Sequence, residues 1–191
     1  ASPTVEGGDM TVIDQSLTWR KVEERLATES DPVLRRNLEL LLQHMKAEAA
    51  LDMEPLMATV SEQARYENFG AESTVLEGKA AVRAFYEAFA ASGAHKLQFD
   101  IDRLVVDRHC ILTEGTMRMA YPGRTLAARG IAVDDPDPHN LFETNMAVVW
   151  PIGPDGLFIG EDSYSGRDGF EGIADRKIDP ADIILFDASP V

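Results

Sequence analysis

The spacing of apolar residues along this chain changes once, close to Gly93. Upstream of that point they recur every three or four positions, as along the buried face of an amphipathic helix. The clearest helix start is Asp31–Pro32, an N-cap oxygen followed by proline at the first helical position. Other helices are expected to begin after Ser16, Asp52 and Gly78. The stripe that follows Pro32 consists of Leu34, Leu38, Leu41, Met45 and Ala49.

Downstream of Lys96, apolar and polar residues alternate, which is typical of strands with one buried face. One short strand, 65–68, precedes the last helix, and 69–77 is expected to be a loop. Helices followed by an antiparallel or mixed sheet indicate an α+β fold whose helices cover one sheet face and enclose a pocket. The later strands are expected at 97–106, 110–121, 126–133, 141–150 and 157–165, with an acidic loop at 134–140.

Composition narrows the classes of function. With 191 residues, 45% of them hydrophobic, we expect one domain over 16–191 after a flexible polar arm at 1–15. A net charge of −15 argues against nucleic acid and anionic membranes as partners, because no basic surface offsets their phosphates. No apolar run reaches the roughly 18 residues of a membrane helix. Cys110 is the only cysteine, which excludes an internal disulfide and fits a cytoplasmic location.

Three segments resemble the nuclear transport factor 2-like superfamily, which includes SnoaL-like polyketide cyclases, ketosteroid isomerases and limonene epoxide hydrolases. They are LDMEPLMATVSEQARYENFG from Leu51, LEGKAAVRAFYEAFAAS from Leu76 and MAVVWPIGPDGLFIGEDSYSG from Met146. The resemblance spans residues 35–166. It implies a cone-shaped curved sheet on the N-terminal helices, and a small hydrophobic ligand of steroid, terpenoid or polyketide type.

The chain departs from the catalytic residues of two relatives. The hydrolases' Arg-x-Asp falls on Gly115 and Met117, and their last Asp falls on Ser163. The isomerases' base Asp falls on Asn68, which takes no proton near neutral pH, and their helix Tyr falls on His44. Neither mechanism is expected intact, and the fold hosts enzymes and binding modules alike.

His44 and Glu48 lie four residues apart, so a helix places them on one side. A carboxylate beside an imidazole raises the pKa of the imidazole and fixes its tautomer, which suits acid–base catalysis. The alternatives are a surface ion pair, or two ligands of a metal site whose other ligands are not evident. We expect His44 to be largely buried, near the same cavity as Tyr66, and we expect no metal.

Tyr66 and Asn68 point to one face of their strand. They offer a phenol and an amide that could polarise a ligand carbonyl. The alternative is a core tyrosine whose hydroxyl is hydrogen-bonded within the protein.

Glu161 lies in the last strand, whose inward phase is ambiguous. The resemblance places Glu161 and Ser163 inward. The apolar pattern instead favours Phe158, Asp162 and Tyr164. We follow the resemblance and take Glu161 as the leading carboxylate of the sheet.

Together these residues predict a cofactor-free acid–base enzyme. His44, Glu48 and Glu161 would move protons while Tyr66 and Asn68 stabilise charge on oxygen, in an isomerisation, dehydration or cyclisation. The alternative is a non-catalytic ligand-binding or protein-interaction domain. The rest of the pocket lining is expected from Met45, Phe85, Phe89, Thr113, Gly115, Met117, Trp150 and Ser163.

A homodimer is also expected. The resemblance implies pairing through the outer face of the sheet, which would hide its apolar residues from water. That face is expected to carry Val106, Leu112 and Thr116.

Overall fold

A computed structural model describes residues 12–69 and 73–187. The helices are α1 Arg20–Thr28, α2 Pro32–Ala49, α3 Met53–Met57, α4 Lys79–Ser92 and α5 Gly123–Ala128, with 3₁₀ turns η1 Gln15–Leu17, η2 Ile173–Asp175 and η3 Pro180–Asp182. The strands are β1 Ile13–Asp14, β2 Val60–Asn68, β3 Thr74–Glu77, β4 Leu97–Val106, β5 Cys110–Pro122, β6 His139–Pro151, β7 Phe158–Ser165, β8 Lys177–Ile178 and β9 Ile183–Ile184. Within the described ranges, no helix combines the length and the apolar character needed to cross a membrane.

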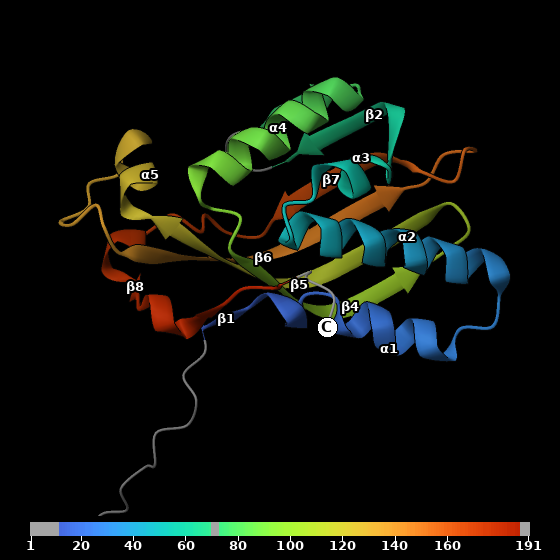
Figure 1. The fold of residues 1–191 in the computed structure, drawn as a ribbon, viewed down its shortest axis with the longest axis horizontal. Coiled ribbons are helices and arrows are strands. Elements are labelled where there is room, and N and C mark those ends of the chain that lie inside the picture. Colours follow the sequence, from blue (N-terminus) through green and yellow to red (C-terminus); the bar gives the residue numbers. More distant parts are fainter. Residues whose placement is uncertain (1–11, 70–72, 188–191) are drawn as a thin grey trace, which may run out of the picture.

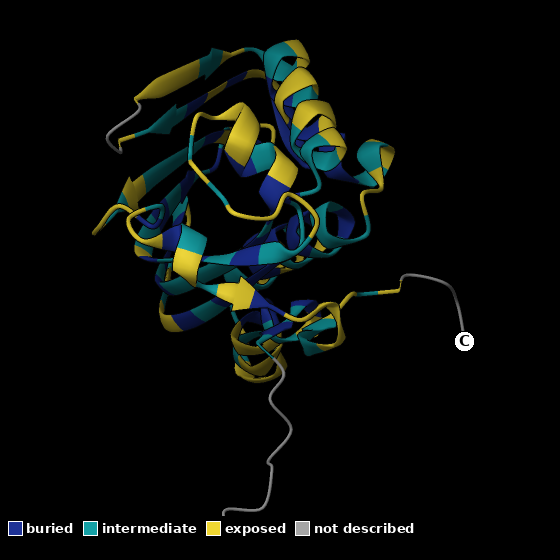
Figure 2. Ribbon diagram, turned by 90° about the vertical axis from the view of Figure 1, so that its left-hand side faces the viewer, coloured by how far each residue is buried: buried dark blue, intermediate teal, exposed yellow. Residues whose placement is uncertain are grey.

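The main sheet has the strand order β3-β2-β7-β6-β5-β4, with β8 added beside β6. β2 and β7 run parallel, and the other pairs in this sheet are antiparallel. The helices α1 to α4 lie on one face of the sheet, α4 over β2 and α2 across the middle (Figure 1). The sheet curls around them, and buried residues gather on its inner side (Figure 2). The expected α+β fold with a curved, mixed sheet is confirmed.

Local signals positioned the helices. The Asp31 carboxylate accepts hydrogen bonds from the backbone N–H groups of Val33 and Leu34, and Pro32 occupies the first turn of α2. At the end of α4, Gly93 adopts the left-handed conformation with φ 76°, which favours glycine. These ends set the direction in which α2 and α4 cross the sheet.

One strand carries a bulge that the alternating pattern did not reveal. Ile101 pairs with Gly115 but Arg103 pairs with Glu114, so β4 holds one extra residue against β5. A Cβ on Gly115 would lie 1.9 Å from the carbonyl oxygen of Asp100. Gly115 is therefore required by the close approach of two backbones, and the expectation that it lines a ligand pocket is wrong.

A second bulge resolves the phase of β7. Ile152, just after β6, pairs with Phe158, and Val149 in β6 pairs with Asp162. The chain advances three residues on the β6 side but four along β7, so β7 holds one extra residue. The extra residue turns both Phe158, before the bulge, and Glu161, after it, toward the helices. The phase favoured by the apolar pattern is therefore correct at Phe158, and the phase implied by the resemblance is correct at Glu161.

Two segments differ from the expected elements. Part of the expected loop at 69–77 is strand β3, which pairs with the end of β2. The expected strand at 126–133 is wrong, because α5 occupies Gly123–Ala128. Its sequence GRTLAA contains good helix formers, and the strand β6 begins at His139, inside the expected acidic loop.

The expected arm at 1–15 is only partly covered by the described residues. Residues 1–11 lie outside them. Ile13 is fully buried and, with Asp14, pairs in parallel with β9 near the other end of the chain. The amide side chain of the buried Gln15 accepts a hydrogen bond from the backbone N–H of Phe186, 3.0 Å away. The end of the expected arm is thus part of the fold.

Candidate functional site

His44 stands at the centre of a buried polar cluster. It lies on α2, is fully buried, and contacts the rings of Trp150 and Phe158 edge-on at centroid distances of 5.3 and 5.5 Å. The sheet curls over this side of the helix, so the expected burial of His44 is confirmed. Burial disfavours the charged imidazolium and lowers the pKa of His44 to about 3. The expectation of a raised pKa is wrong, and His44 is neutral at pH 7.

Both ring nitrogens of His44 have side-chain partners. Nδ1 lies 2.7 Å from the hydroxyl oxygen of Thr59, which itself donates to the Leu56 carbonyl oxygen at 2.6 Å. Nε2 lies 3.1 Å from the hydroxyl of Tyr86, on α4. This hydroxyl is also 3.1 Å from Oε2 of Glu161, so Tyr86 links the buried histidine to the sheet carboxyl.

Glu161 is the carboxyl closest to His44. Its Oε2 lies 3.9 Å from His44 Nε2, and its side chain is 24% exposed. Burial, together with the charge of Asp162, raises the pKa of Glu161 to about 7, although the Tyr86 hydroxyl opposes the shift. A carboxyl with this pKa exchanges protons near neutral pH.

Glu48 shares the electrostatic environment of the site without pairing with His44. Burial of its carboxyl, and then the charge of Glu161, raise the pKa of Glu48 to about 8. Among the described residues, no hydrogen bond or ion pair joins Glu48 to His44. The structure therefore replaces the expected His44–Glu48 dyad with a contact between His44 and Glu161.

Tyr66 and Asn68 face the same pocket as Glu161. In the parallel pairing of β2 with β7, Tyr66 lies opposite Glu161, and Asn68 lies opposite Ser163. The Tyr66 side chain is buried, and its hydroxyl oxygen has no hydrogen-bond partner in the described part of the chain. Burial, and then the charges of Glu161 and Glu48, raise its pKa well above the usual range, so the hydroxyl stays protonated. Tyr66 therefore keeps a hydrogen to donate, and the neighbouring Tyr86 hydroxyl partly opposes the rise in its pKa.

The pocket in front of these groups is small, about 80 Å³. It opens beside α4, between that helix and the ends of β2 and β7. Its lining residues are Tyr66, Glu67, Asn68, Thr74, Leu76, Phe85, Glu161 and Ser163.

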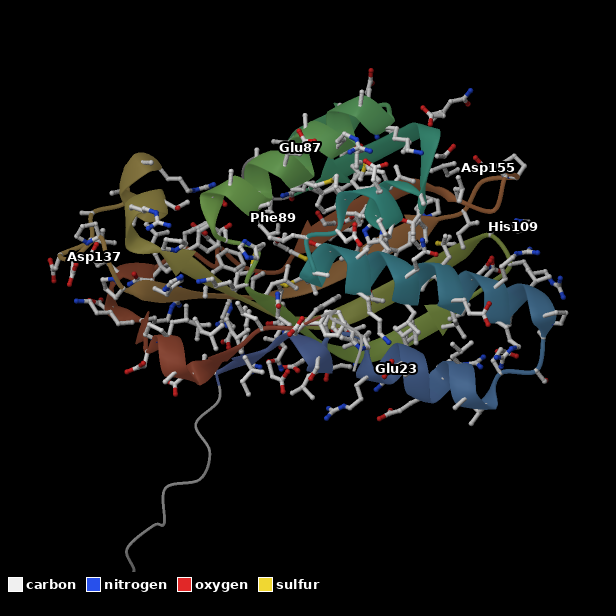
Figure 3. The ribbon with its side chains drawn as sticks, in the orientation of Figure 1. Glu23, Glu87, Phe89, His109, Asp137 and Asp155 are labelled. Carbon is white, nitrogen blue, oxygen red and sulfur yellow. The ribbon has the colours of Figure 1, made fainter. Side chains whose placement is uncertain are left out.

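Of the other residues expected to line the pocket, Phe85 and Ser163 lie in its wall, and their contact with a ligand stays a prediction. Phe85 is 46% exposed rather than buried, because it lies at the rim of the pocket. Phe89 stacks on Phe85 at a centroid distance of 6.0 Å, on the side of α4 that faces the sheet (Figure 3). It is not part of the lining.

The other expected lining residues belong to the core, because helices α1 and α2 fill the middle of the sheet. Thr113 is fully buried and accepts a hydrogen bond from Trp150 Nε1 at 3.0 Å. Met45 and Met117 pack within the same hydrophobic cluster, against Leu41. The expectation that Met45, Thr113, Met117 and Trp150 line a ligand cavity is wrong.

Sequence reasoning missed Tyr86 and Thr59 as parts of the site. Tyr86 follows the buried Val82 by four residues in α4, and this helical spacing carries no signal for a polar role. Thr59 follows α3 without any motif. Their function depends on contacts between α2, α3, α4 and β7 that no local pattern encodes.

A second, larger groove of about 270 Å³ lies at the start of β2, near the turn that carries Asp155 (Figure 3). Ser61 donates a hydrogen bond to Asp155 there, and Lys79 pairs with Glu62. None of the expected site residues reaches this groove. Across the described residues, no group of three or more His, Cys, Asp or Glu side chains is arranged to hold a metal ion.

Residues 41–135 match the sequence profile of the SnoaL-like domain family. This chain carries a SnoaL-like domain. A SnoaL-like protein from Shewanella putrefaciens superposes with a TM-score of 0.62 and 10% identity, over 91% of this chain and 97% of its own. A protein with a ketosteroid isomerase-like fold from Catenulispora acidiphila, solved with trimethylamine, gives a TM-score of 0.54 and 12% identity, over 75% of this chain and 95% of its own. No curated protein matches the sequence. The SnoaL-like domain confirms the resemblance to the nuclear transport factor 2-like superfamily.

Proposed function

We propose that this SnoaL-like domain is an acid–base enzyme in which Glu161 transfers a proton and Tyr66 donates a hydrogen bond to a ligand oxygen. One observation carries the proposal. A carboxyl whose pKa is about 7 shares a small pocket with a buried tyrosine hydroxyl that has no partner among the described residues. A general acid or base works best when its pKa lies near the working pH. A donor already fixed in a dry site stabilises charge that develops on oxygen.

The size of the pocket limits what enters it. Pockets that enclose a drug-sized ligand have volumes of roughly 300–1,000 Å³, whereas this one has about 80 Å³. We infer that only the reacting end of a steroid-, terpenoid- or polyketide-like ligand enters, and that its apolar remainder lies on Phe85. Glu161 then moves a proton at the carbon next to a carbonyl held by Tyr66. Isomerisation, dehydration or cyclisation through an enol-type intermediate follows from such a step.

The test measures proton exchange directly. A panel of small ketones, cyclic enones and a ketosteroid is incubated with the protein in D₂O, and deuterium at carbon is followed by NMR. We expect enzyme-dependent exchange in at least one member. Glu161→Gln should lower its rate by about 10²–10⁴-fold, and Tyr66→Phe by about 10-fold or more, because each removes a group that acts on the reacting atoms.

Glu87→Gln is the matched control. Glu87 lies on the outer side of α4, away from the sheet (Figure 3), and its variant should keep the wild-type exchange rate. An exchange rate that is unchanged in both Glu161→Gln and Tyr66→Phe would refute the proposed acid–base role.

A second candidate is binding of a small organic cation without turnover. No Lys or Arg nitrogen in the described ranges lies within 4.0 Å of the Glu48 or Glu161 carboxyl, and the charges of both carboxyls act on the hydroxyls of two tyrosines, Tyr66 and Tyr86. Carboxylates next to aromatic faces suit an ammonium group. The Catenulispora acidiphila protein of this fold was solved with trimethylamine.

Calorimetric titration with trimethylammonium near pH 9, where Glu161 is ionised, tests this candidate. Saturable binding that weakens at least tenfold in Glu161→Gln, without proton exchange in any ketone, would favour it over the enzyme.

A further inference from the structure

The hydrogen bonds that lead from Leu56 to His44 have only one possible direction. A hydroxyl carries one hydrogen, and Thr59 donates its hydrogen to the Leu56 carbonyl oxygen at 2.6 Å. Toward His44 Nδ1, 2.7 Å away, the Thr59 oxygen can therefore only accept. Because His44 is neutral, its single ring hydrogen must lie on Nδ1, and Nε2 carries a lone pair.

Nε2 then requires a donor, and the Tyr86 hydroxyl at 3.1 Å is the donor that faces it. The same hydroxyl lies 3.1 Å from Glu161 Oε2, but its one hydrogen can serve only one of the two acceptors. When Tyr86 donates to His44, Glu161 completes the chain by donating to the Tyr86 oxygen, which requires a protonated carboxyl. When Glu161 is ionised, Tyr86 turns toward it, and the buried Nε2 of His44 loses its donor, which costs free energy.

We propose that Thr59 and His44 are positioning residues that keep the Tyr86 hydrogen directed away from Glu161 and thereby hold a proton on that carboxyl. The inference rests on the proposed function, since a carboxyl that holds its proton more strongly is, once ionised, a stronger base toward a proton on carbon. It also changes the role expected for His44. His44 exchanges no proton with a ligand and serves as a fixed acceptor at the inner end of the chain.

Other groups also act on Glu161. Glu48 faces it from α2, Tyr66 from β2 and Tyr86 from α4, while Asp162 follows it on β7. The negative charge of Asp162 favours the protonated form of Glu161 as well, and the titration of Glu48, whose pKa is about 8, is coupled to that of Glu161. The test must therefore separate the contribution of the Thr59–His44–Tyr86 chain from these charges.

Two NMR measurements on isotope-labelled protein make this separation. Long-range ¹H–¹⁵N correlation reads the tautomer of His44, and we expect the hydrogen on Nδ1. The carboxyl ¹³C shift of Glu161 reads its titration midpoint. In Thr59→Val, His44 loses its acceptor, moves its hydrogen to Nε2 and donates to the Tyr86 oxygen. Tyr86 then donates to Glu161, whose midpoint should fall by about one pH unit.

Thr59→Ser keeps the hydroxyl and should restore both the tautomer and the midpoint. The decisive comparison is Thr59→Val in a Tyr86→Phe background, where the shift should disappear if Thr59 acts through Tyr86. An Nε2–H tautomer in the wild-type protein would overturn the proposal, even if Thr59→Val does not fold. The proposal would also be overturned if Thr59→Val shifted the Glu161 midpoint equally with and without the Tyr86 hydroxyl. Such a result would indicate that the substitution changes only packing or hydration.

Neither measurement needs a substrate. A protein that shows the expected tautomer and coupling but exchanges no ketone proton would retain this inference and lose the proposed function.

Discussion

His44 and Glu161 lie 3.9 Å apart, yet their pKa values move in opposite directions, to about 3 and about 7. A stable charge pair would raise the pKa of the histidine and lower that of the carboxyl. Burial favours the neutral form of each instead, because a low-dielectric site solvates charge poorly. At this scale, the surroundings of a residue decide its chemistry more than the identity of its neighbour.

The contribution of Glu161 to the unfolding free energy should therefore fall as the pH rises from about 5 to 8. Glu161 has a higher pKa in the folded protein than its ordinary value of 4.5, so the folded state binds more protons in this range and loses stability as the pH rises. By this relation, the raised pKa of Glu161 changes the unfolding free energy by at most about 3 kcal/mol across this range. Urea unfolding across this range should show a shallower decline for Glu161→Gln than for the wild type and Glu87→Gln.

His44 acts in the opposite sense on the acidic side. Its pKa is lower in the folded protein than in the unfolded chain, so its contribution is lost as the pH falls below about 6.5. The prediction for Glu161 would be contradicted if the unfolding free energy changed equally with pH in the wild type and in Glu161→Gln. That result would show that Glu161 titrates normally in the folded protein.

At the scale of elements, bulges determine which residues share a face. The extra residue in β4 places Leu104 and Val106 against the core and leaves Val105 58% exposed. The expectation that Val106 lies on the outer face is therefore wrong. In β7 the corresponding shift brings Glu161 to His44, which creates the site. Alternation alone predicts neither change, because a bulge reverses the phase of every residue beyond it.

Gly115→Ala should destabilise the protein by about 2 kcal/mol or more. The new Cβ would meet the Asp100 carbonyl oxygen at 1.9 Å, so β4 and β5 would have to separate at the bulge. Gly166→Ala is the control, since its Cβ would meet Asn145 at an ordinary 3.5 Å. Chemical denaturation measures both variants, and equal stability of the two would show that the strands adapt without strain.

At the scale of the whole molecule, the outer sheet face combines apolar and charged residues. Arg118 pairs with both Asp100 and Glu143, and Arg167 pairs with Glu143 as well. Any pairing of two copies through this face must accommodate the ion pairs as well as Leu112. The homodimer stays a prediction, and its interface should be sensitive to salt.

Sedimentation velocity at micromolar concentration should show a dimer that added salt favours, because two copies with a net charge of −15 each repel one another at low ionic strength. Leu112→Asp places a charge in the expected interface and should yield monomer without unfolding the protein. A wild-type monomer under all conditions would refute pairing through this face.

Much of the fold could be predicted from the sequence because its signals are local. Asp31–Pro32 and Gly93 terminate helices through their own backbone and cap preferences, whatever the rest of the chain does. The change from helical to alternating spacing likewise reports which side of each element is apolar. The expected strand at 126–133 failed because a short apolar segment is compatible with either structure, and its tertiary contacts chose α5.

The sequence by itself determined the order of the elements, the fold class and a short set of polar residues that included His44, Tyr66 and Glu161. Only the tertiary structure decided which of them meet. Tyr86 and Thr59 became parts of the site because α3 and α4 pack beside α2, and Glu161 meets His44 because a bulge in β7 turns it toward the helices. The reason is physical: propensity and periodicity act over a few residues, whereas hydrogen-bond direction and desolvation depend on groups far apart in the chain.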